Sequence, residues 1–420
     1  MNLLRERGFA LLWIGQSLSS LADWALRAVV LIWVYALTGS GIAVSVVGLA
    51  EALPLLLAAP FAGVFVDRWN RAYTMSGAVV ARAIALLPLL AVNGRANVPI
   101  IVAVTLVANV AAQFFMPAAS AAVPVVAGPE RVGQANSILS LSTGAIAALG
   151  PGAAALLYSA IGPHATVLVL GSLYLVALPV LLAIPAPRPK AAASAGTSLM
   201  TEMRDGFRYM RRSSLLLVLA AIACVAMLGI GAISVLDVVF VTRALHRSAA
   251  SVGLLLSASG VGELTGGIAM SVLAGWAAGR YHRLLGPATI VCGLALLGYA
   301  AAPNLPIAVA VLFVLGLSFP PLLVSFMTLT QLVTENAFMG RVMSLISVGM
   351  AGAQILSMTC GGVLTDLFGV RQVIAAGAVL MCAAGVLGVV KVRSTPAPRS
   401  AANEDSAREG PTTAPGEAAS

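Results

Sequence analysis

Long apolar segments recur along the whole chain, each separated from the next by a short polar stretch. A helix needs about 20 apolar residues to cross the hydrocarbon layer of a bilayer, which is about 30 Å thick. Twelve segments meet this requirement, and we predict that each is a membrane-spanning helix. They cover residues 9–37, 43–65, 74–92, 98–118, 136–160, 165–184, 215–241, 249–274, 284–302, 305–333, 341–365 and 371–391. The predicted fold class is therefore an all-α membrane protein.

The composition agrees with this pattern, since 60% of the residues are hydrophobic and only 9% are charged. A water-soluble domain carries about 25% charged residues, so most side chains here must face lipid or one another. The first apolar segment is too long for the apolar core of a signal peptide, and we expect it to be retained. The four cysteines all fall inside apolar segments, which favours apolar packing over a disulfide framework or a metal site.

Two polar segments divide the chain into domains. Residues 185–214 carry six Lys and Arg residues and separate six predicted helices from the next six. We therefore predict an N-terminal bundle at 1–184, a basic cytoplasmic linker at 185–214 and a C-terminal bundle at 215–393. Residues 394–420 are rich in Pro, Ala, Ser and Glu and have nothing to bury, so we expect a disordered cytoplasmic tail.

The positions of the basic residues predict the orientation. With both termini in the cytoplasm, eighteen of the 24 Lys and Arg residues fall on the cytoplasmic side, and four (Arg95, Arg243, Arg247 and Arg371) fall outside. Such a bias is typical of multi-pass proteins of the cell membrane. It also explains the net charge of +9 without a nucleic-acid partner, because the cations lie at anionic lipid headgroups.

The two halves of the chain resemble each other in sequence. A shift of 207 residues superimposes small and apolar positions of the fifth and eleventh predicted helices, such as Ser137 on Ser344. A shift of 212 superimposes the loops after the second and eighth helices, including Arg68 on Arg280. A parallel repeat of this kind predicts two bundles related by an axis along the membrane normal, with the ligand path between them.

The loop after the second predicted helix contains a motif. Gly63, Asp67, Arg68 and Arg71 follow the spacing G-x-x-x-D-R-x-x-R, which resembles the same loop of the major facilitator superfamily. The resemblance covers residues 5–393 in topology and implies a transporter of two six-helix bundles. It also implies that the motif latches the bundles on the cytoplasmic side in the outward-open state, with Asp67 near the start of the eleventh helix. The alternative is a basic anchor at the membrane surface, which explains the arginines but not Asp67.

Two further segments are similar to a bacterial branch of this superfamily that contains macrolide-efflux and siderophore-export proteins. They are S-S-L-A-D-W at 19–24 and P-E-R-V-G-Q-A-N-S at 129–137. The fifth predicted helix also contains Gly150 and Pro151 in a stretch that resembles the G-P-x-x-G-G element of antiporters, although alanines replace its last two glycines. Because Gly and Pro permit close approach and a bend, the stretch favours export or serves helix packing alone.

Polar residues recur on one face of the first predicted helix. Gln16, Ser20, Asp23 and Arg27 follow steps of four, three and four residues, which places them on one helical face. An ionisable group within the membrane is costly and normally faces protein or water. Burial favours the neutral form of a carboxyl and a neighbouring Arg favours the charged form, so Asp23 is a candidate to bind and release a proton during transport. The alternative is a static pair between Asp23 and Arg27.

Other ionisable residues within predicted helices are further candidates. Glu51 and Glu263, which the shift of 212 superimposes, are alternative proton carriers or neutral packing groups. Arg82 can compensate a carboxylate or bind backbone carbonyls. We expect Asp237 to lie near the outer end of its helix, where water is close, and we assign it no function.

Uncharged polar residues complete the predicted site. Asn109 and Gln113 lie four residues apart on the fourth predicted helix, and Ser344, Ser347 and Gln354 share a face of the eleventh. They are candidates to form hydrogen bonds in a transport cavity or, alternatively, to form hydrogen bonds between helices.

Together these features predict a proton-driven antiporter that exports small amphipathic molecules by alternating access. Uptake by proton symport is the main alternative, followed by a sensor that does not transport and by a membrane enzyme. Neither of the two lysines lies in a nucleotide-binding loop and no nucleophile motif occurs, so we expect no enzyme activity and no cofactor. We expect a monomer whose partners are its substrate, protons and the lipid bilayer.

Overall fold

The computed structural model describes residues 3–58, 69–185, 199–248, 251–277, 279–335 and 338–392. Nearly all of these residues are helical, and none of them forms a β-strand. Three residues of the predicted motif, Gly63, Asp67 and Arg68, lie outside the described residues. The same holds for positions 186–198 of the predicted linker and for the predicted tail.

The described part of the N-terminal half contains long helices joined by short turns. The helices are α1 (Arg7–Thr38), α2 (Gly41–Leu57), α4 (Arg71–Ala85), α5 (Val98–Ala127) and α6 (Val132–Leu182). The turns are η1 (Leu3–Arg5), η2 (Leu87–Ala91), η3 (Arg95–Asn97) and η4 (Pro129–Arg131). Ser40 caps α2 by accepting from the Ala43 N–H, and Asn70 caps α4 by accepting from the Ala72 N–H. Such caps provide acceptors for N–H groups that have no partner within the helix.

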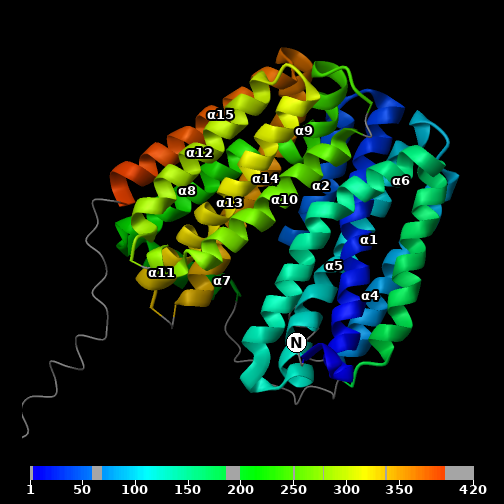
Figure 1. Ribbon diagram of the computed structural model, residues 1–420, viewed down its shortest axis with the longest axis horizontal. Coiled ribbons are helices and arrows are strands. Elements are labelled where there is room, and N and C mark those ends of the chain that lie inside the picture. Colours follow the sequence, from blue (N-terminus) through cyan, green and yellow to red (C-terminus); the bar gives the residue numbers. More distant parts are fainter. Residues whose placement is uncertain are drawn as a thin grey trace, which may run out of the picture.

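The helix α6 combines two predicted spans. Gly162 interrupts it with a φ of 77° and a ψ of 173°, and Pro163 follows. A positive φ is strained for residues that carry a β-carbon, which favours glycine at this position. The two arms of α6 meet at the upper end of the molecule in Figure 1. Gly162 therefore marks the turn between the fifth and sixth spans.

The C-terminal half has a similar set of helices. They are α8 (Ser214–Ile230), α9 (Ile233–Val239), α10 (Val252–Val272), α11 (Ala274–Ala277), α12 (Tyr281–Ala301), α13 (Leu305–Val333), α14 (Met339–Phe368) and α15 (Val370–Leu387). Two π-helical turns, η5 (Phe240–Ala244) and η7 (Gly388–Val392), extend α9 and α15. The seventh predicted span thus consists of three pieces, α8, α9 and η5.

The predicted membrane fold is confirmed. Within the described residues, nine helices are long and apolar enough to cross a membrane, or ten if the bent pair of α7 and α8 is one span. The broken helix α6 accounts for two predicted spans, and the shorter apolar helix α2 accounts for another. Each of the twelve predicted spans overlaps a helix of the structure.

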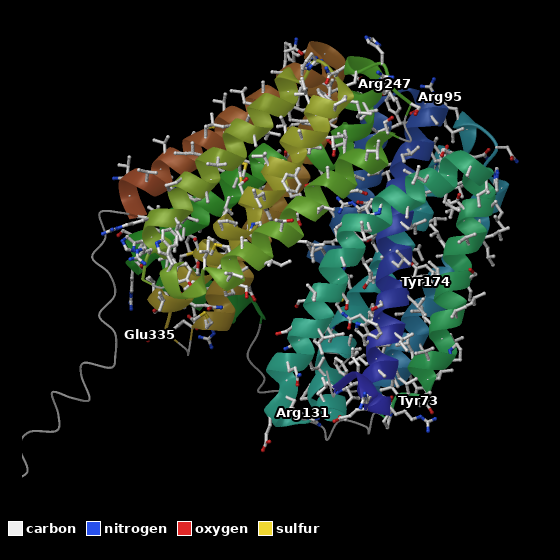
Figure 2. All side chains as sticks on the ribbon, viewed as in Figure 1. Tyr73, Arg95, Arg131, Tyr174, Arg247 and Glu335 are labelled. Carbon is white, nitrogen blue, oxygen red and sulfur yellow. The ribbon has the colours of Figure 1, made fainter. Side chains whose placement is uncertain are left out.

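The helices are arranged in two bundles that lie side by side (Figure 1). One bundle contains α1 to α6, and the other contains α8 to α15. The ribbons of the two bundles meet towards the top of Figure 1 and separate towards the bottom, where the N-terminus lies. Figure 2 labels Arg95 and Arg247 at the upper end and Arg131 and Glu335 at the lower end. We call these the Arg95 end and the Arg131 end.

Small residues bring the bundles into contact along two helix pairs. In the pair α6–α10, a β-carbon at Gly260 would lie 2.1 Å from the Ala148 Cα. In the pair α2–α14, a β-carbon at Gly362 would lie 2.3 Å from the Ser45 Oγ. Helices within a membrane associate through such close backbone packing, because lipid tails provide no hydrophobic driving force between them.

A polar contact also ties the bundles together at the Arg95 end. Arg243 of η5 donates to Asp366 Oδ1 of α14 at 2.9 Å and to the Gly39 carbonyl oxygen at 2.6 Å. Gly39 ends α1 with a φ of 64° and therefore belongs to the other bundle. We call Arg243, Asp366 and Gly39 the Arg243 clasp.

The helix α7 (Leu199–Arg212) lies in the predicted linker, where the sequence analysis predicts no helix. The bend between α7 and α8 is 112°. Asp205 of α7 forms an ion pair with Arg341 of α14 at 3.7 Å, and the ring of Tyr209 stacks on Phe338 at 4.4 Å. These contacts attach the described part of the linker to the start of α14.

Candidate functional site

A cavity of about 300 Å³ lies between the two bundles. Its wall comes from α1, α2 and α5 of the N-terminal bundle and from α14 of the C-terminal bundle. Six of the predicted site residues line it: Asp23, Arg27, Glu51, Asn109, Gln113 and Gln354. The rest of the wall is mostly apolar: Trp24, Leu26, Val30, Ala52, Leu55, Thr105, Ala108, Ala112 and Met358. A few polar groups among apolar ones are typical of sites that bind small molecules.

Asp23 accepts hydrogen bonds from two other helices. Arg82 of α4 contacts both carboxylate oxygens, at 3.0 and 2.9 Å, and the Tyr174 hydroxyl of α6 donates to Oδ1. The Asp23 side chain is 40% exposed, whereas the Arg82 side chain is 1% exposed. The carboxylate therefore reaches the cavity while its counter-charge is enclosed by protein.

Aromatic rings and a hydroxyl hold the Arg82 guanidinium in place. It lies 5.1 Å from the ring of Phe115 and 5.7 Å from the ring of Tyr174. It also donates to Ser19 Oγ at 2.8 Å, and its Nε has no hydrogen-bond partner. A cation over aromatic faces is stabilised by the ring electrons, but a buried cation depends chiefly on its carboxylate. Arg82 and Asp23 therefore form one electrostatic unit.

Arg27 pairs with Glu51 and not with Asp23. The Arg27 Nε lies 3.1 Å from Glu51 Oε2, and the guanidinium lies 5.8 Å from the ring of Trp24. The alternative of a static pair between Asp23 and Arg27 was therefore wrong, because each residue finds its counter-charge on another helix. Glu51 Oε1 is buried and has no hydrogen-bond partner. The cavity wall thus contains carboxylates of two separate ion pairs, Asp23 and Glu51.

The uncharged candidates differ in where they lie. Asn109 and Gln113 line the cavity, and each donates to the backbone carbonyl one turn earlier in α5, at 2.9 and 3.3 Å. Gln354 is the polar residue that α14 contributes to the cavity. Ser344 and Ser347 are exposed and do not line it.

Glu263 lies outside the cavity between the bundles. It lines a smaller cavity of about 160 Å³, together with Pro151 of α6 and Arg27 of α1. Gly150 is buried against Leu21 and Trp24 of α1. The face of α6 that carries the Gly-Pro stretch therefore packs against α1 and α10, which agrees with a role in helix packing.

Arg71 is the motif residue that the structure describes. It begins α4, two positions before Tyr73, which Figure 2 labels at the Arg131 end. Since its partners in the motif lie outside the described residues, the latch stays a prediction.

Two residues that bind the Asp23–Arg82 pair were not predicted from the sequence, and the surroundings of a third residue were predicted wrongly. Tyr174 and Ser19 bind the Asp23–Arg82 pair, yet a single Tyr or Ser in an apolar helix carries no pattern that marks it. Asp237 was expected near water, but it is 4% exposed and accepts from the Tyr299 hydroxyl at 2.8 Å. That expectation was wrong because helices of both bundles cover α9.

Comparison with known proteins identifies a family. The model of the transmembrane secretion effector family, a family of the major facilitator superfamily, matches residues 1–412. The multidrug efflux pump Tap of Mycolicibacterium fortuitum is 26% identical over 400 residues, which cover 91% of this chain and 96% of that protein. Macrolide efflux protein A of Streptococcus pyogenes is 24% identical over 396 residues, which cover 91% of this chain and 95% of that protein.

A solved structure shares the fold. A bacterial homologue of the iron transporter ferroportin, in an inward-facing state, has a TM-score of 0.72 at 16% sequence identity. The similarity covers 93% of this chain and 99% of that one. With two helix bundles, a cavity between them and a family match over nearly its whole length, the chain belongs to the transmembrane secretion effector family of major facilitator superfamily transporters.

Proposed function

We propose that this transporter exports small amphipathic molecules from the cytoplasm in exchange for protons. The observation that carries the proposal is the cavity between the bundles, whose wall contains the pair Arg27–Glu51 and also Asp23, the partner of the enclosed Arg82. The names of two relatives, a macrolide efflux protein and a multidrug efflux pump, support the direction of transport.

Asp23 is the proposed coupling group because it and its partner Arg82 differ in their access to the cavity. Its carboxylate is partly exposed to the cavity, from which it can take a proton, while Arg82 is enclosed. Protonation removes the negative charge that compensates a buried guanidinium, and an uncompensated buried charge is strongly unfavourable. The N-terminal bundle must then rearrange, which links proton binding to a change in the cavity.

Arg27 and Glu51 are the proposed substrate contacts. Glu51 Oε1 has no hydrogen-bond partner although it is buried in the cavity wall, so a polar group of a bound molecule can satisfy it. Asn109, Gln113 and Gln354 supply further hydrogen bonds around the same space. Arg27 lines both the cavity between the bundles and the smaller cavity that contains Glu263. Glu263 is a second candidate for proton exchange.

The driving force is sufficient for such an exporter. A membrane potential of about 100 mV supplies about 2.3 kcal/mol for each proton that enters. Maintaining a gradient of about a hundredfold for a neutral solute requires about 2.7 kcal/mol. One proton together with a small pH difference therefore covers this requirement.

The proposed orientation places the Arg131 end in the cytoplasm of a bacterial cell, because the basic residues of the sequence favour that side. The linker and the tail then lie in the cytoplasm as well. The bundles in this structure are tied at the Arg95 end, so its cavity belongs to the cytoplasmic side. The motif residues Gly63, Asp67, Arg68 and Arg71 are proposed to latch the Arg131 end in the opposite state.

The proposal is tested by drug accumulation in a bacterium that lacks its own efflux pumps. Labelled macrolides, cationic dyes and siderophores are supplied to cells with and without the protein, each with and without a protonophore. We expect lower accumulation of at least one compound in cells with the protein, and we expect the protonophore to abolish the difference. Asp23→Asn should abolish it too, at equal protein abundance in the membrane.

Each outcome has a definite meaning. Raised accumulation in cells with the protein would mean that it takes up the compound and does not export it. Lower accumulation that survives the protonophore would exclude proton coupling. Protonophore-sensitive export that survives in Asp23→Asn would move the coupling site to Glu51 or Glu263.

A further inference from the structure

The C-terminal bundle contains a second buried aspartate, Asp237, which the proposed transport cycle does not use. Asp237 lies in α9 and is 4% exposed. Its Oδ1 accepts from the Tyr299 hydroxyl at 2.8 Å, and the ring of Tyr299 is held at 4.4 Å from the ring of Phe240. Among the ion pairs of the described residues, none includes Asp237.

The two bundles place their aspartates in related settings. Asp23 lies on the first helix of its bundle, and Asp237 lies on the first span of the other. The helix α4, which supplies Arg82 to Asp23, corresponds to α12 when the chain is shifted by the 212 residues of the internal repeat. In the C-terminal bundle α12 supplies the Tyr299 hydroxyl. The helix that supplies a guanidinium to the first aspartate therefore corresponds to the helix that supplies a hydroxyl to the second.

The charged groups on the neighbouring elements do not replace that guanidinium. The elements packed against α9 are α1, α2, α10, α14, α15 and η5, and α12 also reaches Asp237 through Tyr299. Arg243 is bound in its clasp, and Arg371 donates to the carbonyl oxygens of Ala300 and Ala244. The remaining charged groups on these elements are Arg7, Asp23 and Arg27 on α1, Glu51 on α2, Glu263 on α10, Arg283 on α12, and Arg341 and Asp366 on α14. Arg27 lies on α1, which packs against α9, and it is paired with Glu51.

We propose that Asp237 is a second proton-binding site of this transporter. A carboxylate enclosed by protein without a contacting cation favours its neutral form, so Asp237 holds a proton in this conformation. The proton resides on Oδ2, since Oδ1 accepts from Tyr299. Part of the enclosure comes from α1 and α2 of the other bundle. Separation of the bundles at the Arg95 end admits water, and the proton then exchanges between Asp237 and that water.

Arg27 gives this site a link to the transport cavity. Its guanidinium lines the cavity and pairs with Glu51, and its helix α1 packs against α9, which carries Asp237. A bound molecule that displaces Arg27 from Glu51 changes the charge that Asp237 experiences. Substrate binding and proton binding at Asp237 are thereby coupled. This coupling rests on the proposed export function, whereas proton binding by Asp237 does not.

Infrared spectroscopy tests proton binding directly. The wild-type protein and Asp237→Asn are reconstituted in lipid, and the carboxyl C=O stretching band is followed through a pH titration. We expect a band in wild type at neutral pH that is absent from Asp237→Asn and disappears from wild type at high pH. Identical spectra for the two proteins at neutral pH would overturn the proposal.

Two variants assign the band. Tyr299→Phe should shift its frequency upwards, because the carbonyl loses a hydrogen bond while the ring remains. Asp205→Asn should leave it unchanged, because Asp205 lies on α7, is partly exposed and pairs with Arg341. A band that Asp205→Asn removes and Tyr299→Phe leaves in place would also contradict the assignment to Asp237.

A transport assay tests the coupling. With a compound that wild type exports, Asp237→Asn should lose proton-driven export but keep exchange of labelled for unlabelled compound at equal pH. Exchange needs binding and bundle movement but no net proton flow, so a merely misfolded variant would lose both. Full proton-driven export in Asp237→Asn would exclude the coupling. If wild type exports no compound, the proposed function fails, and the infrared result still decides whether Asp237 binds a proton.

Discussion

At the scale of single residues, two paired groups of opposite charge have unequal access to water. Asp23 faces the cavity, while Arg82 is enclosed by Phe115, Tyr174 and Ser19. Hydration can stabilise the carboxylate when its partner is lost, but it cannot reach the guanidinium. Loss of Asp23 and loss of Arg82 should therefore lower the stability of the bundle by different amounts.

This asymmetry predicts different effects of removing either partner. Asp23→Ala should lower the free energy of unfolding by about 3–5 kcal/mol, the usual effect of leaving a buried charge without its partner. Arg82→Met should lower it by less, because the remaining carboxylate is 40% exposed. The measurement is urea unfolding of the purified protein in detergent.

The double variant Asp23→Ala/Arg82→Met serves as the control. It should recover part of the loss seen in Asp23→Ala, because it removes the stranded cation. A larger loss in Arg82→Met than in Asp23→Ala would show that access to water does not distinguish the partners.

At the scale of elements, the contact between α6 and α10 depends on glycine. A β-carbon at Gly260 would lie 2.1 Å from the Cα and 2.6 Å from the Cβ of Ala148. Since the backbone of α6 cannot rotate away as a flexible side chain can, the two helices would have to separate. In contrast, a β-carbon at Gly267 of the same helix would meet nothing within 4 Å.

Two alanine substitutions in α10 test this contact. Gly260→Ala should destabilise the protein by about 1–3 kcal/mol through overpacking. Gly267→Ala should be neutral or stabilising by up to about 1 kcal/mol, the gain in helix propensity. Thermal unfolding in detergent compares the two directly. Equal melting temperatures would mean that the bundles do not depend on this close approach.

At the scale of the whole molecule, the bundles are held at one end by the Arg243 clasp and by α2 against α14. The clasp joins Arg243 and Asp366 of one bundle to the Gly39 carbonyl of the other. Ser45, which packs against Gly362 nearby, is 3% exposed. If the bundles separate at the Arg95 end, Ser45 should become accessible to water.

Loss of the clasp should shift the protein towards that open state. In a variant without the four native cysteines, Ser45→Cys should react with a maleimide several-fold faster when Arg243→Ala is added. Arg247→Ala is the matched control, because Arg247 lies at the same end and forms no ion pair among the described residues. Equal labelling rates in the two variants would contradict a role of the clasp in holding the bundles closed.

The sequence by itself determined the class of the fold and the positions of the apolar segments that form the spanning helices. Whether a segment crosses a bilayer depends on its own length and apolarity, and the repeat between the halves indicated two bundles. The polar residues that face the cavity were also recognisable, because an ionisable group such as Asp23 or Glu51 is costly within a membrane and stands out from the apolar residues around it.

The tertiary structure alone decided which of these residues are partners. Asp23 lies 59 positions from Arg82 and 151 from Tyr174 in the sequence. Arg27 forms its ion pair with Glu51 of α2 and not with Asp23, which lies one turn away on the same helix. The burial of Asp237 likewise depends on helices of both bundles. Ion pairing and desolvation are set by distances through space between helices, and these distances follow from how the helices pack and not from the local pattern of any one of them.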